Sequence, residues 1–408
     1  MNLASTENPT DVLIAGAGPV GLSLAAALIK RGLSVVVVEA AAELSHEARA
    51  STIHPPTLEM FAEWGFVNEV LAKGRVIDRL QFWERRTREL IAEFDYARLA
   101  DDTPYPYRFQ CPQSTVTRCI LPLLQRHELA QVYFEHELIG FNDDGARVTA
   151  RVSTPAGERE FNARYLIGCD GSRSRVRTEL KLGFSGKTYE DRFLLFATDL
   201  DMQPFFPGMG PVAYLFDPEE WAIVMQLPAI TRLVFRLRDD EDAMEAQREN
   251  NVRQRIAGLL GETIDCAVNG VWVYHIHQRV TASFRAGRVL LAGDAAHINN
   301  PTGGMGMNSG IHDAWFLANA LEAALREGDD EQLDRYAEQR RRAATEAVQQ
   351  MSDANYNNLI ISDPAARAAR NEDLRATAAD PDKARQFLRR QAMLEDWLVR
   401  RNTRRLSS

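Results

Sequence analysis

The segment DVLIAGAGPVGLSLAAALIKRGLSVVVVE, residues 11–39, decides the fold class of this chain. An apolar run, the glycine-rich turn Gly16-Ala-Gly18-Pro-Val-Gly21, an Ala/Leu-rich stretch and a second apolar run follow one another in it. Pro19 suits the first turn of a helix, where its missing N–H costs nothing, and Gly32 suits the left-handed residue that ends one. The segment therefore predicts a strand, a helix and a parallel strand, the βαβ unit of an α/β fold.

The glycine-rich turn has the spacing of a dinucleotide-binding fingerprint. Glycines at these positions permit a tight turn, backbone approach to a pyrophosphate and close packing of the helix on the strand, and helix N–H groups then face the phosphates. Glu39 ends the second strand, where a carboxylate accepts a hydrogen bond from a ribose hydroxyl and repels a 2′-phosphate. The pattern favours FAD or NAD over NADP at this site. The predicted contacts are Gly16, Gly18, Pro19, Val20, Gly21, Glu39 and Ala40.

The rest of the chain predicts that this nucleotide-binding domain is interrupted. Helical patterns cover 57–71 and 115–129 with polar loops between them, and separate short strands, including 158–162 and 164–169, follow from residue 131. Strand patterns between 183 and 280, with a charged helix over 239–260, predict a mainly antiparallel second domain. The predicted division is a nucleotide-binding domain in three parts (1–75, 111–182 and 281–330), a substrate-domain segment (76–110), a β-sheet substrate domain (183–280) and a helical C-terminal region (331–408).

A second glycine-rich constellation follows a strand pattern at 288–292. It reads Gly293-Asp-Ala-Ala-His297 and, further on, Pro301-Thr-Gly-Gly-Met-Gly-Met-Asn308, and a helix is predicted from 308 to 327. A carboxylate at a strand end can bind ribityl hydroxyls, and loop N–H groups at a helix N-terminus can stabilise the negative charge of a reduced flavin. The four glycines between 303 and 310 exceed what a plain strand–turn–helix connection requires. The constellation therefore favours a flavin.

Three motifs, in order and spacing, carry a family resemblance: the early glycine-rich turn, Cys169-Asp-Gly-Ser-Arg-Ser-Arg175 and Gly293-Asp-Ala-Ala-His297. Together they resemble the signatures of the group A FAD-dependent aromatic hydroxylases, the relatives of para-hydroxybenzoate hydroxylase and phenol hydroxylase, over about residues 10–325. The resemblance implies a discontinuous Rossmann-like FAD-binding domain, a mainly antiparallel β-sheet substrate domain and a helical C-terminal region. Because 408 residues leave no room for a thioredoxin-like C-terminal domain, the chain looks like a short form of the family.

The resemblance also implies roles for individual residues. Glu39 would bind the adenosine ribose of FAD, Arg49 would lie near its phosphate or ribose, and Asp170 is associated with both FAD and the nicotinamide donor. Met305 stands where the family often has glutamine, so a side-chain hydrogen bond is lost while the backbone role remains. The further FAD contacts that the resemblance implies are Gln113, Arg118, Gly293, Asp294 at the ribityl and pyrophosphate region, Pro301 on the flavin face, Gly304, Gly306, Met307 and Asn308.

The predicted strands of the middle domain supply the candidates for the substrate side. Such strands would form a sheet over the flavin, with alternate residues facing it. Tyr214 or Tyr274 could hydrogen-bond a substrate phenol, and His275 or His277 could help to remove its proton. An aromatic residue or histidine in a sheet is more often core or surface, so the residues alone do not select a base. The candidate catalytic set is Pro301, Tyr214, Tyr274 and His275.

The resemblance implies a monooxygenase that hydroxylates a phenolic or N-heteroaromatic ring. NADH or NADPH would dock transiently and reduce the flavin, and O₂ would add to give a C4a-hydroperoxide that attacks the ring; the protein would orient the substrate and exclude water. The same scaffold hosts isoprenoid reductases and epoxidases, flavin halogenases and a non-catalytic binding protein. The Trp-x-Trp-x-Ile-Pro segment of halogenases is missing, and the intact Asp294 and glycine loop argue against the binding protein.

Composition limits the partners that we expect. Apolar residues make up 45% and charged residues 26%, which is typical of a compact globular chain. With 48 Lys and Arg against 57 Asp and Glu, the net charge is −9, which disfavours a nucleic-acid partner. The four cysteines have no close pairing of the kind that holds a metal, so no metal is expected.

No apolar run approaches the roughly 20 residues of a membrane span, and residues 1–10 lack a signal-peptide pattern, so we expect a cytoplasmic enzyme without a membrane partner. Its expected partner is a small aromatic substrate. The C-terminal segment has two open interpretations, docking of a second subunit as a homodimer or a solvated helix face. Both rest on the pairs Arg389-Arg390, Arg400-Arg401 and Arg404-Arg405.

Overall fold

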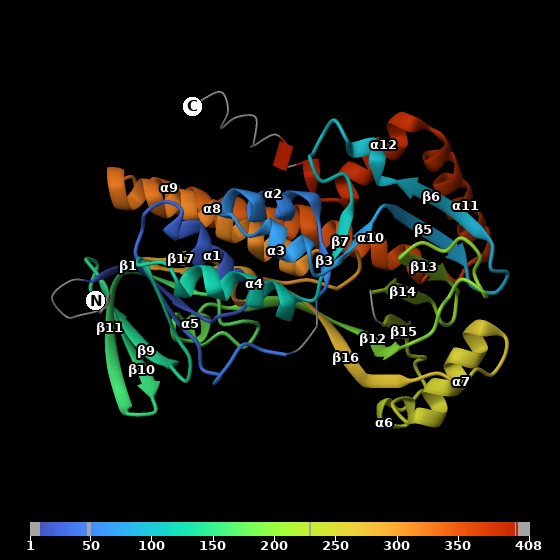
Figure 1. Cartoon of the computed structure of the whole chain (residues 1–408), viewed down its shortest axis with the longest axis horizontal. Helices are drawn as coiled ribbons and strands as arrows, with labels where there is room; N and C mark the ends of the chain where they lie inside the picture. The colour runs from blue at the N-terminus through green and yellow to red at the C-terminus, as the bar shows by residue number, and fades with distance from the viewer. Residues whose placement is uncertain (1–8, 47–49, 228–229, 396, 399–408) are drawn as a thin grey trace.

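The structure is a computed structural model, and it describes residues 9–46, 50–227, 230–395 and 397–398. The described residues form two eight-stranded sheets and one three-stranded sheet, together with helices. Figure 1 shows the two large sheets next to one another, with helices layered over the first and the last helices of the chain beside the second. The predicted fold class, an α/β nucleotide-binding domain with a mainly antiparallel sheet and a helical C-terminal region, is confirmed.

The first sheet is built on the βαβ unit. β1 (Thr10–Ala15) pairs in parallel with β2 (Val35–Val38), and α1 (Pro19–Ile29) connects them. Both strands are buried nearly throughout, as their Val-, Ile- and Leu-rich sequences require in a parallel sheet. The strand order is β17-β18-β11-β1-β2-β8, and β9 and β10 extend β11 as antiparallel strands. The other bounds are β8 (Ala130–Tyr133), β9 (Glu137–Asp143), β10 (Val148–Thr154), β11 (Gly157–Gly168), β17 (Arg285–Ala286) and β18 (Val289–Leu291).

Some element boundaries differ from those predicted. The two short strands expected over 158–169 are one continuous strand, β11, whose first half pairs antiparallel with β10 and whose second half pairs parallel with β1. The helix expected over 57–71 is two helices, because Gly65 adopts φ +91° and ends the first. The charged helix over 239–260 is likewise divided. The resulting pairs are α2 (Pro55–Trp64) with α3 (Val67–Leu71), and α6 (Ala243–Ala246) with α7 (Glu249–Leu260).

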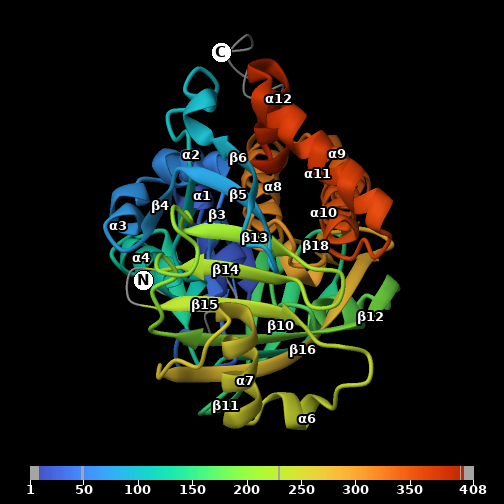
Figure 2. The same cartoon turned by 90° about the vertical axis from the view of Figure 1, so that its right-hand side faces the viewer.

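The second sheet has the order β19-β16-β12-β15-β14-β13-β5-β6 and is shown in Figure 2 with α7 in front of it. Its two faces belong to different hydrophobic clusters. Phe193 and Val234 lie in the cluster that includes the first sheet, whereas Leu194 and Phe235 pack with α7. Alternate residues of each strand therefore face inward and outward. The bounds are β5 (Arg79–Glu84), β6 (Leu90–Asp95), β12 (Phe184–Thr198), β13 (Val212–Phe216), β14 (Ala222–Gln226), β15 (Thr231–Arg236), β16 (Val268–Thr281) and β19 (His297–Ile298).

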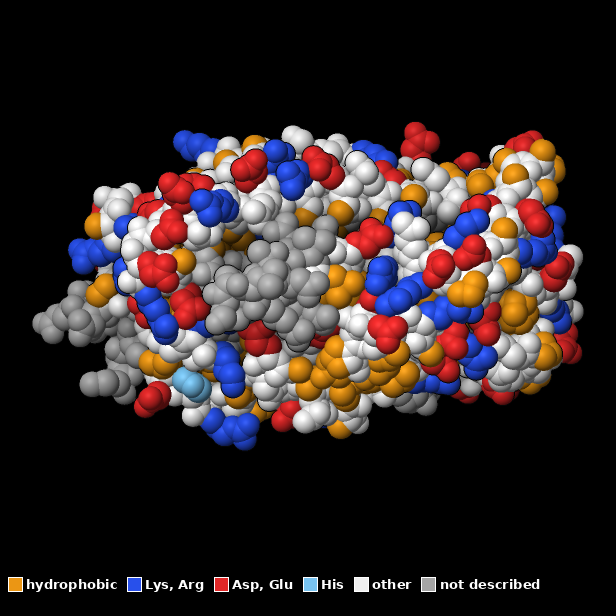
Figure 3. Space-filling model, turned by 90° about the horizontal axis from the view of Figure 1, so that it is seen from above, with side chains coloured by type: hydrophobic (Ala, Val, Ile, Leu, Met, Phe, Trp, Pro, Cys, Tyr) orange, Lys and Arg blue, Asp and Glu red, His pale blue; other side chains and the backbone are white. Residues whose placement is uncertain are grey.

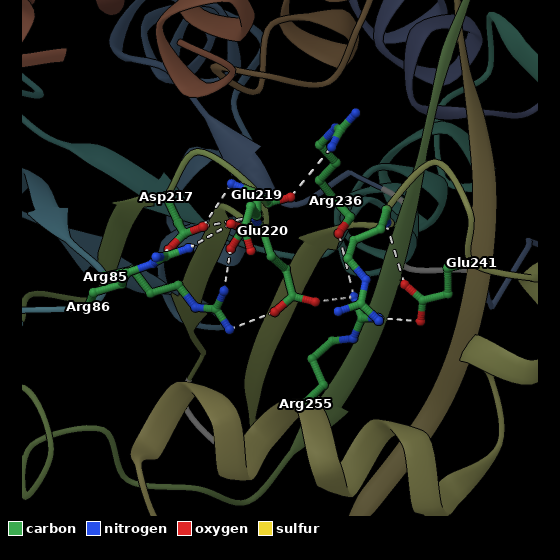
Figure 4. A network of polar contacts seen from close by, with 9 residues as sticks. Arg85, Arg86, Asp217, Glu219, Glu220, Arg236, Glu241 and Arg255 are labelled. Atoms are coloured by element: carbon green, nitrogen blue, oxygen red, sulfur yellow. Dashed lines mark hydrogen bonds and ion pairs between the residues drawn. The ribbon is translucent and has the colours of Figure 1, made fainter. Parts of the chain in front are cut away.

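A network of ion pairs fastens α7 to the ends of β5, β13 and β14 (Figure 4). Glu220 lies 2.7 Å from Arg255 of α7 and 2.6 Å from Arg85, which follows β5. Arg255 also pairs with Glu241, and Arg86 lies 2.7 Å from the buried carboxylate of Asp217. Because several charges share partners here, the network is stronger than isolated surface pairs.

The helical C-terminal region packs back onto the β5–β6 hairpin. Asp102 is buried and accepts hydrogen bonds from both Arg385 and Arg389, and Phe387 stacks on Phe94 with 4.3 Å between ring centroids. Arg389 is thus bound within the chain, while residues 400–405 lie outside the described part. The remaining bounds are α4 (Gln113–Gln125), α5 (Arg175–Glu179), α8 (Gly306–Glu327), α9 (Glu331–Arg342), a π-helix (Ala343–Gln349), α10 (Gln350–Leu359), α11 (Pro364–Ala379) and α12 (Pro381–Gln391).

Within the described ranges, no helix has both the length and the apolar character needed to cross a membrane. The same residues contain no group of three or more His, Cys, Asp and Glu side chains arranged to hold a metal ion. On the described part of the face shown in Figure 3, basic and acidic side chains are interspersed. The described part of that face therefore presents no broad area of one charge.

Candidate cofactor and substrate site

The glycine-rich turn follows β1 directly. A Cβ atom on Gly16 (φ +106°) would lie 2.5 Å from the carbonyl oxygen of Cys169, and one on Gly21 would lie 2.0 Å from the carbonyl oxygen of Gly16. These two glycines are required by the packing of the turn itself. At Gly18, by contrast, no described protein atom lies within 4 Å of the Cβ position. Gly18 therefore leaves open the space that a pyrophosphate needs.

The helix after this turn begins without a side-chain cap. Pro19 occupies the first turn of α1, and the N-cap residue, Gly18, has no side chain to accept a hydrogen bond from the first N–H groups of the helix. Such a helix N-terminus stabilises a phosphate group. Val20 joins the two glycine-rich segments, because its Cγ2 lies 2.8 Å from the Cβ position of Gly293.

Glu39 follows β2 and turns its carboxylate toward the same turn. One carboxylate oxygen accepts a hydrogen bond from the backbone N–H of Ala17 at 2.7 Å, and the other accepts from that of Ala41 at 3.0 Å. Ala40 between them is exposed. These bonds fix the Glu39 carboxylate beside Gly18, in the place where it can bind the ribose of a dinucleotide.

The predicted contacts on α4 lie at its N-terminal half. The backbone N–H of Gln113 donates to the carbonyl of Ala50 at 2.8 Å. The Arg118 guanidinium donates to the carbonyl of Ser114 at 2.7 Å and lies 3.0 Å from Nδ1 of His46. Arg118 thus connects α4 to the segment after Glu39. Arg49 lies outside the described residues.

Asp170 follows β11 and uses only one of its two carboxylate oxygens within the chain. Oδ2 accepts hydrogen bonds from the backbone N–H groups of Arg175 and Val176, at 2.7 and 3.1 Å, and so holds the start of α5. Oδ1 is buried and has no hydrogen-bond partner among the described residues. A buried acceptor without a partner is rare in native proteins, so Oδ1 suits a ligand that donates a hydrogen bond.

The motif that contains Gly293 is held by a buried ion-pair network that the sequence did not predict. Asp313 of α8 accepts from the backbone N–H of Gly293 at 2.9 Å and from Nε2 of His297 at 2.8 Å, and Arg340 of α9 donates to its other oxygen at 2.6 Å. Burial disfavours the ionised carboxyl of Asp313, but Arg340 and His297 outweigh burial and lower its pKa from 3.8 to about 2. No local pattern marks Asp313 or Arg340, since their partners are distant in sequence.

The second glycine loop is shaped by its contacts with β3 (Thr52–Ile53). Gly304 adopts φ +67°, and a Cβ atom there would lie 2.6 Å from the side chain of Thr52. Asn308 is fully buried; its amide donates to the carbonyls of Thr52 and Gly304 at 2.8 Å each and accepts from the backbone N–H of His54 at 2.9 Å. The Asn308 side chain therefore shapes the loop.

The same loop leads into α8, which begins at Gly306 without a side-chain cap. The first N–H groups of α8 can thus stabilise negative charge on a flavin ring. The side chains of Met305 and Met307 are buried, so both residues are available to a cofactor only through their backbone. Asp294 and Pro301, by contrast, are exposed at either end of this region.

The substrate-side candidates lie on two different faces of the second sheet. Tyr214 of β13 is 8% exposed and belongs to the inner cluster, where its ring stacks on Phe82 at 5.6 Å between centroids. Tyr274 of β16 packs against the same cluster. His275 and His277 are exposed and alternate with Tyr274, so they lie on the opposite face of β16. The structure therefore separates His275 from the two tyrosines, and no ring bound on the inner face can meet it.

Together these features fit FAD. Gly18 leaves room for a pyrophosphate, Glu39 is oriented for a ribose, Asp170 keeps a free buried acceptor, and two helices begin uncapped beside glycine-rich segments. The fit was predictable at Gly18 and Glu39, where motif spacing is informative. It was not predictable for Thr52 and Asp313, which act through contacts across the fold.

Comparison with known proteins agrees with this site. The family model described as "FAD binding domain" matches residues 9–351. Para-nitrophenol 4-monooxygenase of a Pseudomonas species is 34% identical over 92% of this chain and 94% of its own length. 6-Hydroxy-3-succinoylpyridine 3-monooxygenase of Pseudomonas putida is 30% identical over 95% of this chain and 98% of its own length.

Solved structures agree as well. The crystal structure of p-nitrophenol 4-monooxygenase from Pseudomonas putida superposes with a TM-score of 0.88 at 32% identity, over 94% of this chain and 98% of that one. A ternary complex of aklavinone-11 hydroxylase with FAD and aklavinone superposes with a TM-score of 0.76 at 30% identity, over 86% of this chain and 69% of that one. The chain therefore belongs to the FAD-binding family of group A flavoprotein hydroxylases and is an FAD-dependent aromatic monooxygenase that uses NAD(P)H and O₂.

Proposed function

We propose that this enzyme hydroxylates a small phenol or hydroxypyridine at the ring carbon para to the hydroxyl group, and that the substituent on that carbon is lost. Two relatives that match over 92% and 95% of this chain support the proposal by their names. In para-nitrophenol 4-monooxygenase, carbon 4 of the substrate carries the nitro group. In 6-hydroxy-3-succinoylpyridine 3-monooxygenase, carbon 3 carries the succinoyl group. In both names the numbered carbon is para to the hydroxyl.

The observation that carries the proposal in this chain is the hydroxyl group of Tyr214. The side chain is 8% exposed on the inner face of the sheet, and among the described residues its hydroxyl forms no hydrogen bond and is not one of the buried atoms that lack a partner, so it reaches open space. Such a hydroxyl can take a bound ligand as its hydrogen-bond partner. The hydroxyl of a phenolic substrate would be that partner, and this contact would fix the orientation of the ring and hence the carbon that is attacked.

The chain contributes positioning and the bound FAD contributes the redox chemistry, since it supplies the electrons and the activated oxygen for hydroxylation. We propose that Glu39, Asp170 and Asp294 bind FAD and that the backbone of Gly304–Asn308 holds its ring. Pro301 would line the flavin face. The apolar inner face of the second sheet would exclude water, which protects a reactive species from wasteful breakdown.

Stopped-flow reduction of the bound FAD by NADH or NADPH tests the proposal. We expect phenols and hydroxypyridines with a para substituent, such as 4-nitrophenol and 4-hydroxybenzoate, to accelerate flavin reduction and to release one substituent per NAD(P)H oxidised. 4-Methylphenol, whose methyl group is a poor leaving group, serves as the control. Hydroxylation that retains the substituents of all of these rings would contradict the proposed position of attack.

Two matched variants test the part assigned to Tyr214. Tyr214→Phe should retain FAD and still oxidise NAD(P)H, but release peroxide instead of product, because the ring is no longer oriented. Tyr274→Phe removes a hydroxyl from the same face, and the ratio of product to NAD(P)H oxidised should change less. An equal fall in the ratio of product to NAD(P)H oxidised in the two variants would contradict the proposal that Tyr214 in particular orients the ring.

A further inference from the structure

Arg108 is a deeply buried cation that has no carboxylate partner among the described residues. It belongs to β7 (Arg108–Gln110) and is 2% exposed. Its Nη2 donates to the carbonyl of Gln391 at 2.9 Å, and its Nε is buried without a partner in the described part of the chain. Two other buried arginines have carboxylate partners, since Arg255 lies 2.7 Å from Glu220 and Arg340 lies 2.6 Å from Asp313. Arg177 and Arg370, each 8% exposed, bond instead to backbone carbonyls and, for Arg370, to Asn371. A buried charge is costly without a counter-ion, and Arg108 is the least exposed of the buried arginines to which no described residue supplies a carboxylate within 4 Å.

The groups around Arg108 also lack partners. The hydroxyl of Tyr96, the Oε1 of Gln110 and the Nδ1 of His54 are buried and form no hydrogen bond of normal geometry within the described residues, and the Arg108 side chain lies close to the Tyr96 hydroxyl. Tyr96 and His54 have no exposed surface, and Gln110 is 1% exposed. Four of the fourteen such atoms in the described residues belong to Arg108 and these three neighbours. Their occurrence beside one unpaired cation indicates a site for a polar ligand.

This cluster lies beside the flavin loop. Arg108 and Gln110 alternate along β7, so they share one face of the three-stranded sheet that β7 forms with β3 and β4 (Arg75–Ile77). On that face the Gln110 amide donates to Oγ1 of Thr52 at 3.0 Å, and the Thr52 side chain lies against Gly304. Nε2 of His54 lies 3.0 Å from the carbonyl oxygen of Gly303.

The cluster also extends toward the substrate face. The Arg108 guanidinium carbon lies 5.7 Å from the centroid of the Tyr96 ring. Burial raises the pKa of Tyr96 to about 12, and the charge of Arg108 opposes this rise while the neighbouring Tyr214 adds to it. Tyr96 is therefore within electrostatic range of both Arg108 and Tyr214. Arg108 is thus connected to the glycine loop through Gln110 and Thr52, and to Tyr214 through Tyr96.

We propose that Arg108 is the counter-cation of the aromatic substrate, binding its negatively charged oxygen, with Tyr96 donating a second hydrogen bond to that oxygen. The charged oxygen belongs either to the ionised hydroxyl of the ring or to an acidic ring substituent. His54 stays neutral, because burial and then the charge of Arg108 lower its pKa well below the usual value, so it does not compete for the anion. The enzyme selects anionic aromatic substrates over neutral ones. The inference rests on the proposed function, since it concerns the substrate of that same site.

Binding to the purified FAD-loaded enzyme tests this selection. Aromatic ligands are titrated while the absorbance of the bound FAD is followed at pH 8, where 4-nitrophenol is ionised and 4-methylphenol is neutral. In Arg108→Met we expect the Kd of 4-nitrophenol to rise about tenfold or more, because a hydrogen bond to a charged group is lost, and the Kd of 4-methylphenol to change less than about threefold. Benzoate, which has a carboxylate and no hydroxyl, separates the two sources of charge. In Arg108→Met the Kd of benzoate should rise together with that of 4-nitrophenol only if an acidic ring substituent can reach Arg108.

Two further variants control the experiment. Arg98→Met removes an exposed arginine two residues after Tyr96 and should leave both affinities unchanged. Arg108→Lys keeps the charge and should restore part of the affinity for 4-nitrophenol. Equal weakening of anionic and neutral ligands in Arg108→Met would overturn the inference, because it would show a structural effect.

The wild-type enzyme provides a test that needs no variant. The affinity for 4-nitrophenol should increase as the pH rises through the pKa of its hydroxyl, whereas the affinity for 4-methylphenol should stay constant over the same range. Equal affinity for the ionised and neutral forms of 4-nitrophenol overturns the inference, even where the same ring is hydroxylated. If no phenol or hydroxypyridine perturbs the flavin or accelerates its reduction, the proposed function itself fails.

Discussion

Among single residues, the glycines of the first turn show how one residue type serves two purposes. Gly16 and Gly21 are glycines because the chain passes close to them, at 2.5 Å and 2.0 Å from their Cβ positions. Gly18 is surrounded by open space instead. The sequence motif alone does not distinguish these positions, whereas the structure assigns the first two to the turn and the third to the cofactor.

This difference leads to a prediction for two alanine variants. Gly18→Ala should fold with an unchanged melting temperature in the FAD-free state but bind FAD about tenfold or more weakly, because its methyl group enters the pyrophosphate space. Gly21→Ala should lower the melting temperature of the FAD-free chain as well, since its Cβ would lie 2.0 Å from a carbonyl oxygen. FAD titration and thermal unfolding of the FAD-free variants measure both effects. Equal FAD affinity in Gly18→Ala and the wild type would contradict this assignment.

At the scale of elements, the docking of α12 depends on one carboxylate. Asp102 accepts from Nε of Arg385 at 3.0 Å and from Nε of Arg389 at 2.9 Å, and its side chain is buried. Burial tends to raise the pKa of Asp102, but the two guanidinium groups prevail and lower it. The neighbouring Asp101 is exposed and lies 3.7 Å from Arg385. These two aspartates make a matched pair for experiment.

We expect Asp102→Asn to loosen α12 from the β5–β6 hairpin and Asp101→Asn to leave it in place. The first change leaves two arginines beside a neutral group and should cost about 1–3 kcal/mol of stability, while the second should cost less than about 1 kcal/mol. Limited proteolysis should then cut between α11 and α12 faster in Asp102→Asn only. Equal protection of both variants would show that the stacking of Phe387 on Phe94 suffices to hold the helix.

Local sequence signals predicted elements better than they predicted boundaries. The βαβ unit followed from residues 11–39 because periodicity, Pro19 and Gly32 agree there. The helix over 57–71 was predicted as one element, since glycine is tolerated inside a helical pattern, yet Gly65 ends it with a left-handed residue. β11 was predicted as two strands, although it is one strand that pairs with β10 in its first half and with β1 in its second. This change of partner depends on the other strands of the sheet, so the sequence of β11 alone does not show it.

For the whole molecule, the site joins segments that are far apart in sequence, and this limits what the sequence can reveal. The cofactor motifs were readable because each is a continuous stretch. The pairing of Asp313 with Arg340, and the placement of Arg108 beside the flavin loop, depend on how separate segments pack. A buried aspartate inside a helix such as α8 carries no local signal that would distinguish it from an exposed one.

The pH dependence of stability follows from this central network. Asp313 connects α8 to Gly293, His297 and Arg340, and its pKa in the folded chain is lowered from 3.8 to about 2. A carboxyl whose pKa is lowered by folding contributes its full stabilisation at pH values above its pKa in the unfolded chain. This contribution is lost as the pH falls from about 4 toward 2. Acid should therefore remove part of the stability of the wild-type chain within that window.

Asp313→Asn tests this prediction, because it leaves Arg340 buried without a counter-ion. At pH 7 the variant should lose about 3–5 kcal/mol in the free energy of unfolding by urea, and the difference from the wild type should narrow as the pH falls below about 4. Asp334→Asn removes an exposed carboxylate of α9 that pairs with Arg285 of β17; it is the control and should change stability by less than about 1 kcal/mol. A stability difference that stays constant from pH 7 to pH 3 would mean that the Asp313 side chain acts through packing. The stabilisation that the wild-type chain gains from an ionised Asp313 must decrease as the pH falls through this range.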